Sequence, residues 1–204
     1  MTVVNGYTDV ATLASFISVN DSDLDLELES AINAASRQID AHCGRRFWQD
    51  STVKVREYRA DDRYILHVDD ISTATGLIIK LDTDDDDVFE TTVTINTDFV
   101  LAPYNAAEEV PVRPYTAIEL VDNYTFPTNY RRPGVQVTAK FGWPAVPDAV
   151  KQACLIQAKN IYKASVGSIA GYQVAGDTGI VVRSPNLDFM AMSLLEDFRR
   201  GWVG

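Results

Sequence analysis

The sequence has few of the side chains that build metal centres and redox sites. Its 204 residues include only two cysteines and two histidines, which are Cys43, Cys154, His42 and His67. They form no HExxH pair, no pair of CxxC motifs and no cluster with zinc-ligand spacing. We therefore expect no metal site and no cofactor. We also expect both cysteines to be reduced, buried thiols, because each falls in a helical pattern far from the other.

Long apolar runs and an excess of basic residues are also missing. No apolar run approaches the roughly 20 residues that span a membrane, and residues 1–10 lack the basic and apolar regions of a signal peptide. We therefore expect a cytoplasm-like compartment and no membrane contact. Lys and Arg number 18 against 29 Asp and Glu, which gives a formal net charge of −11. Proteins that wrap DNA or coat anionic membranes depend on Lys and Arg, so this charge argues against both roles.

Signatures of catalysis and of phosphate binding are absent as well. The sequence contains no GxSxG elbow, no GxxxxGK[ST] loop and no GxGxxG fingerprint. The glycine-rich stretch 166–182 is therefore predicted to be a mobile loop, or one that a partner orders, since glycine raises the entropy cost of fixing the backbone. No residue is nominated as catalytic, and we predict that the chain is not an enzyme.

Helical periodicity marks both ends of the chain, which is long enough to bury a core without disulfides or metals. Apolar residues recur there every three or four positions. Thr8 or Asp9 is a suitable N-cap for the first helix, Gly44 ends the second, and Ser184 with Pro185 begins the last. The predicted helices span residues 8–18, 22–43, 148–164 and 185–200. The inward face of the last helix is predicted to carry Leu187, Met190, Ala191, Leu194 and Phe198.

Alternating, β-branched segments fill the middle of the chain. The predicted strands span residues 53–59, 64–68, 77–81, 88–95, 117–121 and 135–141. The sequence thus predicts an α+β fold class with a helical bundle formed by both chain ends, residues 1–46 and 142–204. An antiparallel β domain, residues 47–141, is inserted between them and is expected to be a small sandwich or barrel.

The run of acidic residues from Asp82 to Asp87 is expected to form the loop of a hairpin. Hard cations such as Ca²⁺ prefer several carboxylates, but an EF-hand needs glycine at the sixth position and glutamate at the twelfth. Counted from Asp82, those positions hold Asp87 and Val93. The run is therefore a solvated loop, an adventitious cation site, or an acidic tip that faces a channel or partner. For the last role the candidate residues are Asp84, Asp85, Asp86 and Asp87.

Charge is distributed unevenly along the chain. Residues 1–110 contain 8 basic and 22 acidic residues, whereas residues 111–204 contain 10 basic and 7 acidic residues. A subunit of a stacked ring could use two faces of different charge to contact two neighbours. Ordinary solvated surfaces are the other explanation of this asymmetry.

Three segments resemble tailed-phage head-to-tail adaptor proteins, which are also called head-completion or connector proteins. The segments are residues 31–48 (AINAASRQIDAHCGRRFW), 141–163 (FGWPAVPDAVKQACLIQAKNIYK) and 179–201 (GIVVRSPNLDFMAMSLLEDFRRG). The resemblance implies a non-enzymatic virion protein of the capsid vertex or neck, assembled in the host cytoplasm. Such proteins form a ring, usually twelve-fold, beneath the portal, extend the DNA channel and dock the stopper or tail. The implied partners are portal protein, a stopper or tail-completion protein, other copies of the chain, and passing DNA bound without sequence specificity.

Basic and aromatic residues near helix ends are the candidate contacts in such a ring, because Arg and Trp are common at interface centres. The candidate portal or ring contacts are Arg45, Arg46, Lys159, Lys163, Arg199, Arg200 and Trp202. The β insertion is larger than in compact all-helical members of the family, so its partner stays open. Two alternatives from other classes are a monomeric module that binds a ligand or protein through the β insertion, and a hydrolase.

Overall fold

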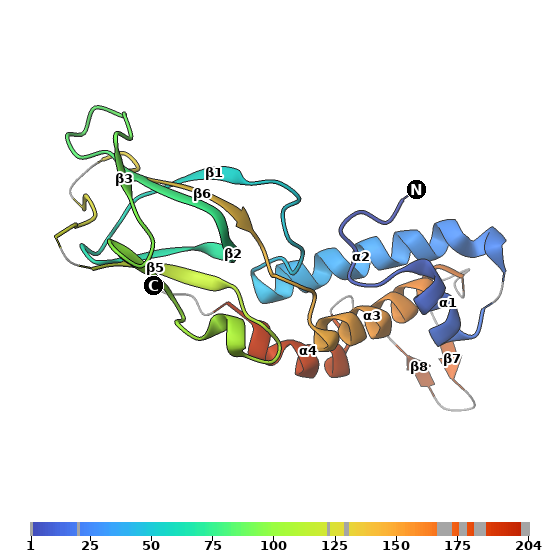
Figure 1. The fold of residues 1–204 in the computed structure, drawn as a ribbon. Helices are drawn as coiled ribbons and strands as arrows, with labels where there is room; N and C mark the ends of the chain where they lie inside the picture. The colour runs from blue at the N-terminus through green and yellow to red at the C-terminus, as the bar shows by residue number, and fades with distance from the viewer. Residues whose placement is uncertain are drawn as a thin grey trace. The chain divides into compact units, whose positions relative to one another are not determined.

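The structure is a computed structural model of the chain, and it describes residues 2–19, 21–121, 123–128, 131–166, 173–175, 179–181 and 187–200. The chain divides into two compact units (Figure 1). The helical unit comprises Met1–Phe47 and Val146–Gly204, and the β unit comprises Trp48–Ala145. The expected α+β class is confirmed. No helix among the described residues combines the length and the apolar character needed to cross a membrane.

The helical unit contains helices from both ends of the chain. These are α1 (Val10–Ile17), α2 (Asp25–Cys43) after a short 3-10 helix (Ser22–Leu24), α3 (Asp148–Val166), and α4 (Phe189–Leu195) with a 3-10 extension (Glu196–Phe198). Helix α3 packs against both α2 and α4, and α1 contacts α2 and α3. Between α3 and α4, β7 (Gln173–Ala175) pairs with β8 (Gly179–Val181). The prediction of a loop over 166–182 was therefore wrong for these strands, because ladder hydrogen bonds offset the entropy cost of the nearby glycines.

The ends of α1 and α2 follow from the predicted capping residues. The Asp9 carboxylate accepts a hydrogen bond from the Thr12 N–H at 2.8 Å, as an N-cap does. Gly44 ends α2 with a φ of +64°, a left-handed conformation that glycine adopts without strain. The apolar face of α2 is buried and includes Leu28, Ile32, Ala35 and Ile39.

Helix α4 begins later than the sequence predicts. Asp188, rather than Ser184, is its N-cap, and its carboxylate accepts from the Met190 N–H at 2.9 Å. The same carboxylate accepts from the Asn160 side chain of α3 at 3.0 Å, so contact with α3 fixes the start. The later start changes which residues face inward: Met190 is 66% exposed, whereas Leu195 is fully buried.

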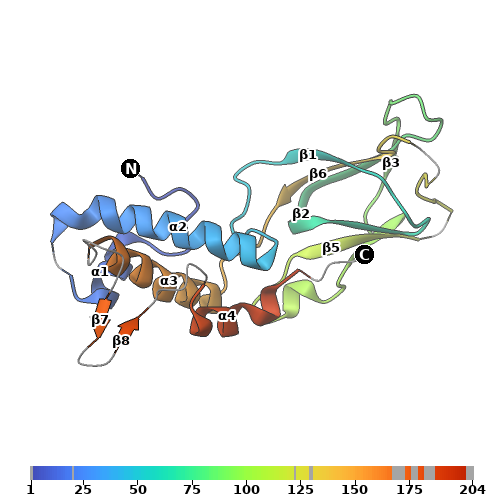
Figure 2. The ribbon, with the colours of Figure 1, turned by 180° about the vertical axis from the view of Figure 1, so that it is seen from behind.

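The N-terminal segment before α1 runs beside α2 (Figure 2), and Tyr7 connects this segment to the rest of the helical unit. Its hydroxyl donates to the Asp40 carboxylate of α2 and accepts from the Phe47 N–H at 2.9 Å. Its backbone N–H donates to the Ser36 Oγ at 3.1 Å, and its ring packs edge-on against Phe47 with centroids 5.7 Å apart. One buried side chain thus connects the segment before α1, the middle of α2 and the residue that ends the first part of the unit.

The β unit is one six-stranded, antiparallel sheet. Its strands are β1 (Lys54–Tyr58), β2 (Ile65–Leu81), β3 (Thr91–Val93), β4 (Phe99–Ala102), β5 (Tyr115–Leu120) and β6 (Val135–Phe141). The order is β1-β6-β2-β5-β4, with β3 also pairing with β2. Apolar side chains from most of these strands form one core cluster, which includes Ile71, Ile79, Phe99, Val137 and Phe141.

The expected sandwich or barrel is replaced by this open sheet. The predicted strands 64–68 and 77–81 are the two ends of β2, a strand of 17 residues. Its register shifts several times between His67 and Ile78. Such irregularities bend a strand, so the first part of β2 pairs with β5 and its last part with β3 and β6. One bent strand, β2, therefore replaces the two separate strands that the sequence predicts.

The FGWP turn after β6 belongs to the second segment that resembles the adaptors. Gly142 has a φ of +107°, and a Cβ atom there would lie 1.9 Å from the Trp48 carbonyl oxygen. The Gly142 N–H donates to the Asp70 carbonyl at 2.7 Å. The Trp143 side chain is fully buried and donates from Nε1 to the Asp70 carboxylate at 3.1 Å. The turn thus needs glycine for close backbone contact, and its tryptophan is a buried side chain that Asp70 holds by a hydrogen bond.

Candidate functional site

Four of the predicted interface residues come together at the C-terminal end of α2. Arg45 and Arg46 directly follow Gly44. The Arg200 N–H donates to the Cys43 carbonyl at 2.8 Å, which places Arg199 and Arg200 beside the same turn. We call Arg45, Arg46, Arg199 and Arg200 the arginine cluster. It joins residues more than 150 positions apart in the chain.

The surroundings of the arginine cluster combine cations with a partly buried carboxylate. Arg199 pairs with Glu196 at 3.4 Å, and Arg37 pairs with Asp40 at 3.2 Å. Burial raises the pKa of Asp40, and the Tyr7 hydrogen bond and the charges of Arg37 and Arg46 oppose the rise. The arginines of the cluster are exposed or half-buried, so their charges can bind a charged surface of a partner. The described residues around them show no arrangement for proton transfer to a substrate.

The Cys43 thiol, next to the arginine cluster, has low reactivity. Burial raises the pKa of Cys43 to about 12, so the reactive thiolate is scarce at neutral pH. Burial also raises the pKa of Cys154. Both cysteines are buried free thiols, as the sequence predicts.

The two predicted lysines lie elsewhere in the helical unit. The Lys159 ammonium on α3 lies 5.6 Å from the centroid of the Phe16 ring of α1, and Lys163 is exposed one turn later. Both lie on α3, whereas the arginine cluster is at the end of α2. Trp202 lies outside the described residues.

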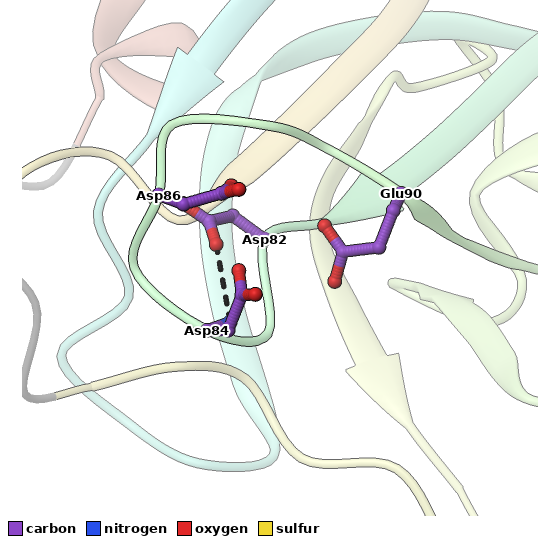
Figure 3. Close-up of side chains that lie close together, drawn as sticks. All are labelled: Asp82, Asp84, Asp86 and Glu90. Atoms are coloured by element: carbon purple, nitrogen blue, oxygen red, sulfur yellow. Dashed lines mark hydrogen bonds between the residues drawn. The ribbon is translucent and has the colours of Figure 1, made fainter.

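The acidic run forms a compact loop after β2 (Figure 3). Asp82 is only 1% exposed, and its carboxylate accepts from the backbone N–H groups of Asp84, Asp85 and Asp87 at 3.3, 2.8 and 3.0 Å. Asp85 and Asp87 have positive φ angles of 63° and 68°, which aspartate tolerates better than most residues. The hydrogen bonds of Asp82 therefore fix the conformation of the loop, and the other aspartates lie along its backbone.

Three exposed carboxylates gather around Asp82. Ligand oxygens of Asp82, Asp84, Asp86 and Glu90 all lie within 4.8 Å of one another (Figure 3). The nearby charge of Asp86 is the main reason why the pKa of Asp84 is raised. Glu90 accepts from the Thr83 hydroxyl, which lowers its pKa. Such a group can attract a divalent cation, but the internal hydrogen bonds of the loop already account for its shape.

The predicted acidic residues therefore divide into two sets. Asp84 and Asp86 join the cluster, whereas Asp87 forms an ion pair with Arg132 and Asp85 lies outside the cluster. Sequence reasoning missed Glu90, because the predicted second strand of the hairpin begins at residue 88. In the structure Leu81 pairs with Thr91, and this register places Glu90 opposite Asp82.

Beside this loop the β unit has an open hollow of about 550 Å³. Its lining includes Arg63, Asp82, Thr125 and Phe126. The mixture of one cation, one carboxylate and one aromatic ring gives no set of convergent groups for a particular ligand, so the hollow favours no substrate class.

Comparisons with known proteins complete the description. No family model and no curated protein matches the sequence. Among the solved structures that match, three cover 100% of this chain and 96% of their own chains. A chain in the neck of the empty GTA particle, computed with C6 symmetry, has a TM-score of 0.59 at 19% identity. A chain in the neck of the native particle, computed with C12 symmetry, has a TM-score of 0.52 at 20% identity. A chain in the virion of the native gene transfer agent (GTA) particle has a TM-score of 0.53 at 22% identity.

These matches confirm, at the level of the fold, the resemblance that the three sequence segments indicated. At this identity the likeness establishes shape rather than shared residues. Over its whole length, the chain has the fold of a protein from the neck of a phage-like particle.

Proposed function

We propose that the chain is a structural protein of a virion neck, which forms a twelve-fold ring beneath the portal and joins the capsid to the stopper or tail. The observation that carries the proposal is the shared fold with GTA neck chains over the full length of both proteins. The three adaptor-like segments add independent support from the sequence. In this role the protein catalyses no reaction, and DNA passes it without sequence-specific binding.

The symmetry of the matched structures supports a ring. Those necks were computed with C6 and C12 symmetry, and a cyclic ring repeats one heterologous contact between identical subunits. Each subunit then needs two different, complementary surfaces. Opposite charges on different parts of this chain are suited to that requirement.

Within this proposal the two units have separate tasks. The helical core, residues 1–46 and 142–204, forms the ring as a bundle, and the β domain, residues 47–141, provides a further contact surface for a neighbour. The arginine cluster provides a compact basic contact for portal or for the next subunit. The exposed carboxylates of the 82–87 loop face a basic partner or the channel, whose wall should repel DNA phosphates rather than retain them.

The proposal is tested by mixing the purified chain with its cognate portal protein and weighing the complexes by native mass spectrometry. We expect portal particles that carry twelve copies of the chain. A chain that stays monomeric and never associates with portal would contradict the proposal and would favour a monomeric binding module. A double variant, Arg199→Ala with Arg200→Ala, should weaken the complex. The double variant Lys54→Ala with Arg59→Ala, at two exposed cations of the β unit, is the matched loss of two positive charges.

A further inference from the structure

The outward side of the sheet carries an uncovered apolar row. Strands β1, β6 and β2 are neighbours in the sheet (Figure 1). Val55 of β1 and Ile78 of β2 both lie opposite Thr138 of β6, so the three side chains form one row across these strands. Val55 is 58% exposed and Ile78 is 47% exposed. Val53, which directly precedes β1, is 44% exposed, and its Cγ1 lies 3.2 Å from the position of a Cβ atom built on Gly76 of β2. We call Val53, Val55, Ile78 and Thr138 the outer sheet face.

Positive charge flanks this face on two sides. Lys80 lies two residues after Ile78, and Lys140 lies two residues after Thr138, so both side chains share the side of the outer sheet face. The row next to the outer sheet face consists of Glu57, Gln136 and Lys80, which lie opposite one another on β1, β6 and β2. Glu57 is the acidic residue of this row. An apolar centre with lysines at its margin suits a partner that presents an apolar side chain among carboxylates.

The start of α2 presents such a surface. Residues 9–29 contain six carboxylates and no Lys or Arg. In their midst Leu26, on the first turn of α2, is 61% exposed. Asp25 and Glu27 flank it, and both are exposed. We call residues 23–27, which comprise the end of the short 3-10 helix and the first residues of α2, the acidic helix tip.

We propose that, in the neck ring, the acidic helix tip of one copy docks on the outer sheet face of the next copy. This inference rests on the proposed ring function and names the contact that closes the ring. The two surfaces differ and have opposite charge, so the contact is heterologous and repeats around a ring. Leu26 meets the row of Val55 and Ile78, while Glu27 meets Lys140 or Lys80.

The acidic 82–87 loop is a less suitable occupant of the same face. Its buried Asp82 is engaged with backbone N–H groups, and Asp87 is paired with Arg132. The apolar residue nearest to the carboxylates is Val88, which is 55% exposed and is carried on the loop rather than on a regular helix. The helix tip offers a rigid backbone, so ordering it costs less entropy.

Disulfide trapping on the portal-bound assembly tests the contact. The double variant L26C/V55C, oxidised on portal, should give a ladder of covalent oligomers on non-reducing gels. A mixture of the two single variants should give only dimers, because each copy then has one reactive partner. The native cysteines are buried and give little background. The matched pair V88C/V55C tests the 82–87 loop and should give no ladder.

Charge exchange provides a second readout on the same complexes. Glu27→Lys and Lys140→Glu should each weaken assembly about tenfold, since like charges then face each other, and the combined variant should recover most of the loss. Portal-bound assemblies that form without the L26C/V55C ladder, or that crosslink through V88C instead, would overturn this contact and leave the ring proposal standing. A chain that remains monomeric with portal would overturn both.

Discussion

Replacing Tyr7 by Phe removes one buried hydroxyl and leaves the shape of the side chain unchanged. That hydroxyl donates to Asp40 and accepts from the Phe47 N–H at 2.9 Å, and Tyr7 is only 2% exposed. Burial and the neighbouring Asp40 carboxylate raise the pKa of Tyr7, so the hydroxyl keeps its proton and remains a donor at every physiological pH. The variant therefore deletes two hydrogen bonds at a point where three segments of the helical unit meet.

The expected cost follows from the groups left behind. A buried polar group that loses its partner costs about 1–3 kcal/mol. The Phe47 N–H loses the hydroxyl as its acceptor, whereas Asp40 keeps its ion pair with Arg37 at 3.2 Å. The penalty on Asp40 is thus at the low end, and the two losses together should lower the free energy of unfolding by about 2–3 kcal/mol.

Urea unfolding, followed by far-UV circular dichroism, measures this change. Tyr104→Phe is the matched control, because the Tyr104 hydroxyl also donates to a carboxylate, that of Glu119, but the residue is 66% exposed. Its loss should change the free energy of unfolding by less than about 0.5 kcal/mol. Equal effects of the two variants, or a Tyr7→Phe protein as stable as the parent, would refute the reasoning.

Three further predictions concern backbone strain, thiols and acid stability. Gly142→Ala should lower the free energy of unfolding by about 3 kcal/mol or more in urea titrations, because a Cβ atom meets backbone at 1.9 Å. Gly76→Ala, with a φ of +78° and only a side-chain contact at 3.2 Å, should cost about 1 kcal/mol. Cys43 and Cys154 should not react with a thiol reagent in the folded protein, and both should react in denaturant; fast labelling of the native protein would contradict their burial. Hydrogen bonds from the Thr12 N–H and, to a smaller extent, from the Thr12 hydroxyl lower the pKa of Asp9 below its usual value of 3.8. The ionised cap therefore stabilises the fold above pH 3.8, and this stabilisation is lost as the pH falls through the pKa of Asp9 in the folded state. Thermal unfolding between pH 2 and 5 should show a smaller acid loss for Asp9→Asn, and an unchanged profile would argue against the cap.

Local signals predict the helices of this chain well. The Asp9 cap, the Gly44 stop and the buried stripe of α2 are short-range features, and the structure contains each of them. The start of α4 was predicted wrongly because Asp188 is also a good cap, and its contact with Asn160 of α3 decides between the candidates. That contact joins residues far apart in sequence, which periodicity does not detect.

The sheet shows the limit of pattern reasoning more clearly. Period-two patterns found most strands. The two predicted strands 64–68 and 77–81 are joined into β2 because β5 and β6 pair with it on both sides of the register shifts between His67 and Ile78. Strand β4 was missed because Phe99–Ala102 is too short to show a period. Tertiary pairing therefore decided between a sandwich and one bent, open sheet.

The candidate site was partly accessible from the sequence. Charged residues could be selected by type and by their place at helix ends, and four of the residues selected lie beside one turn as the arginine cluster. Their role at an interface stays a prediction. Their meeting depends on the hydrogen bond between Arg200 and Cys43, which no local pattern indicates. The same reasoning grouped Lys159 with them, although its ammonium lies over Phe16. Glu90 was missed because only the hairpin geometry brings it to Asp84 and Asp86.

Cryo-electron microscopy of the chain bound to its cognate portal, reconstructed without imposed symmetry, tests the central claim most directly. The account predicts one ring of twelve copies, coaxial with the portal, whose central opening continues the DNA channel. Portal particles without density for the chain, or single copies bound away from the axis, would contradict it.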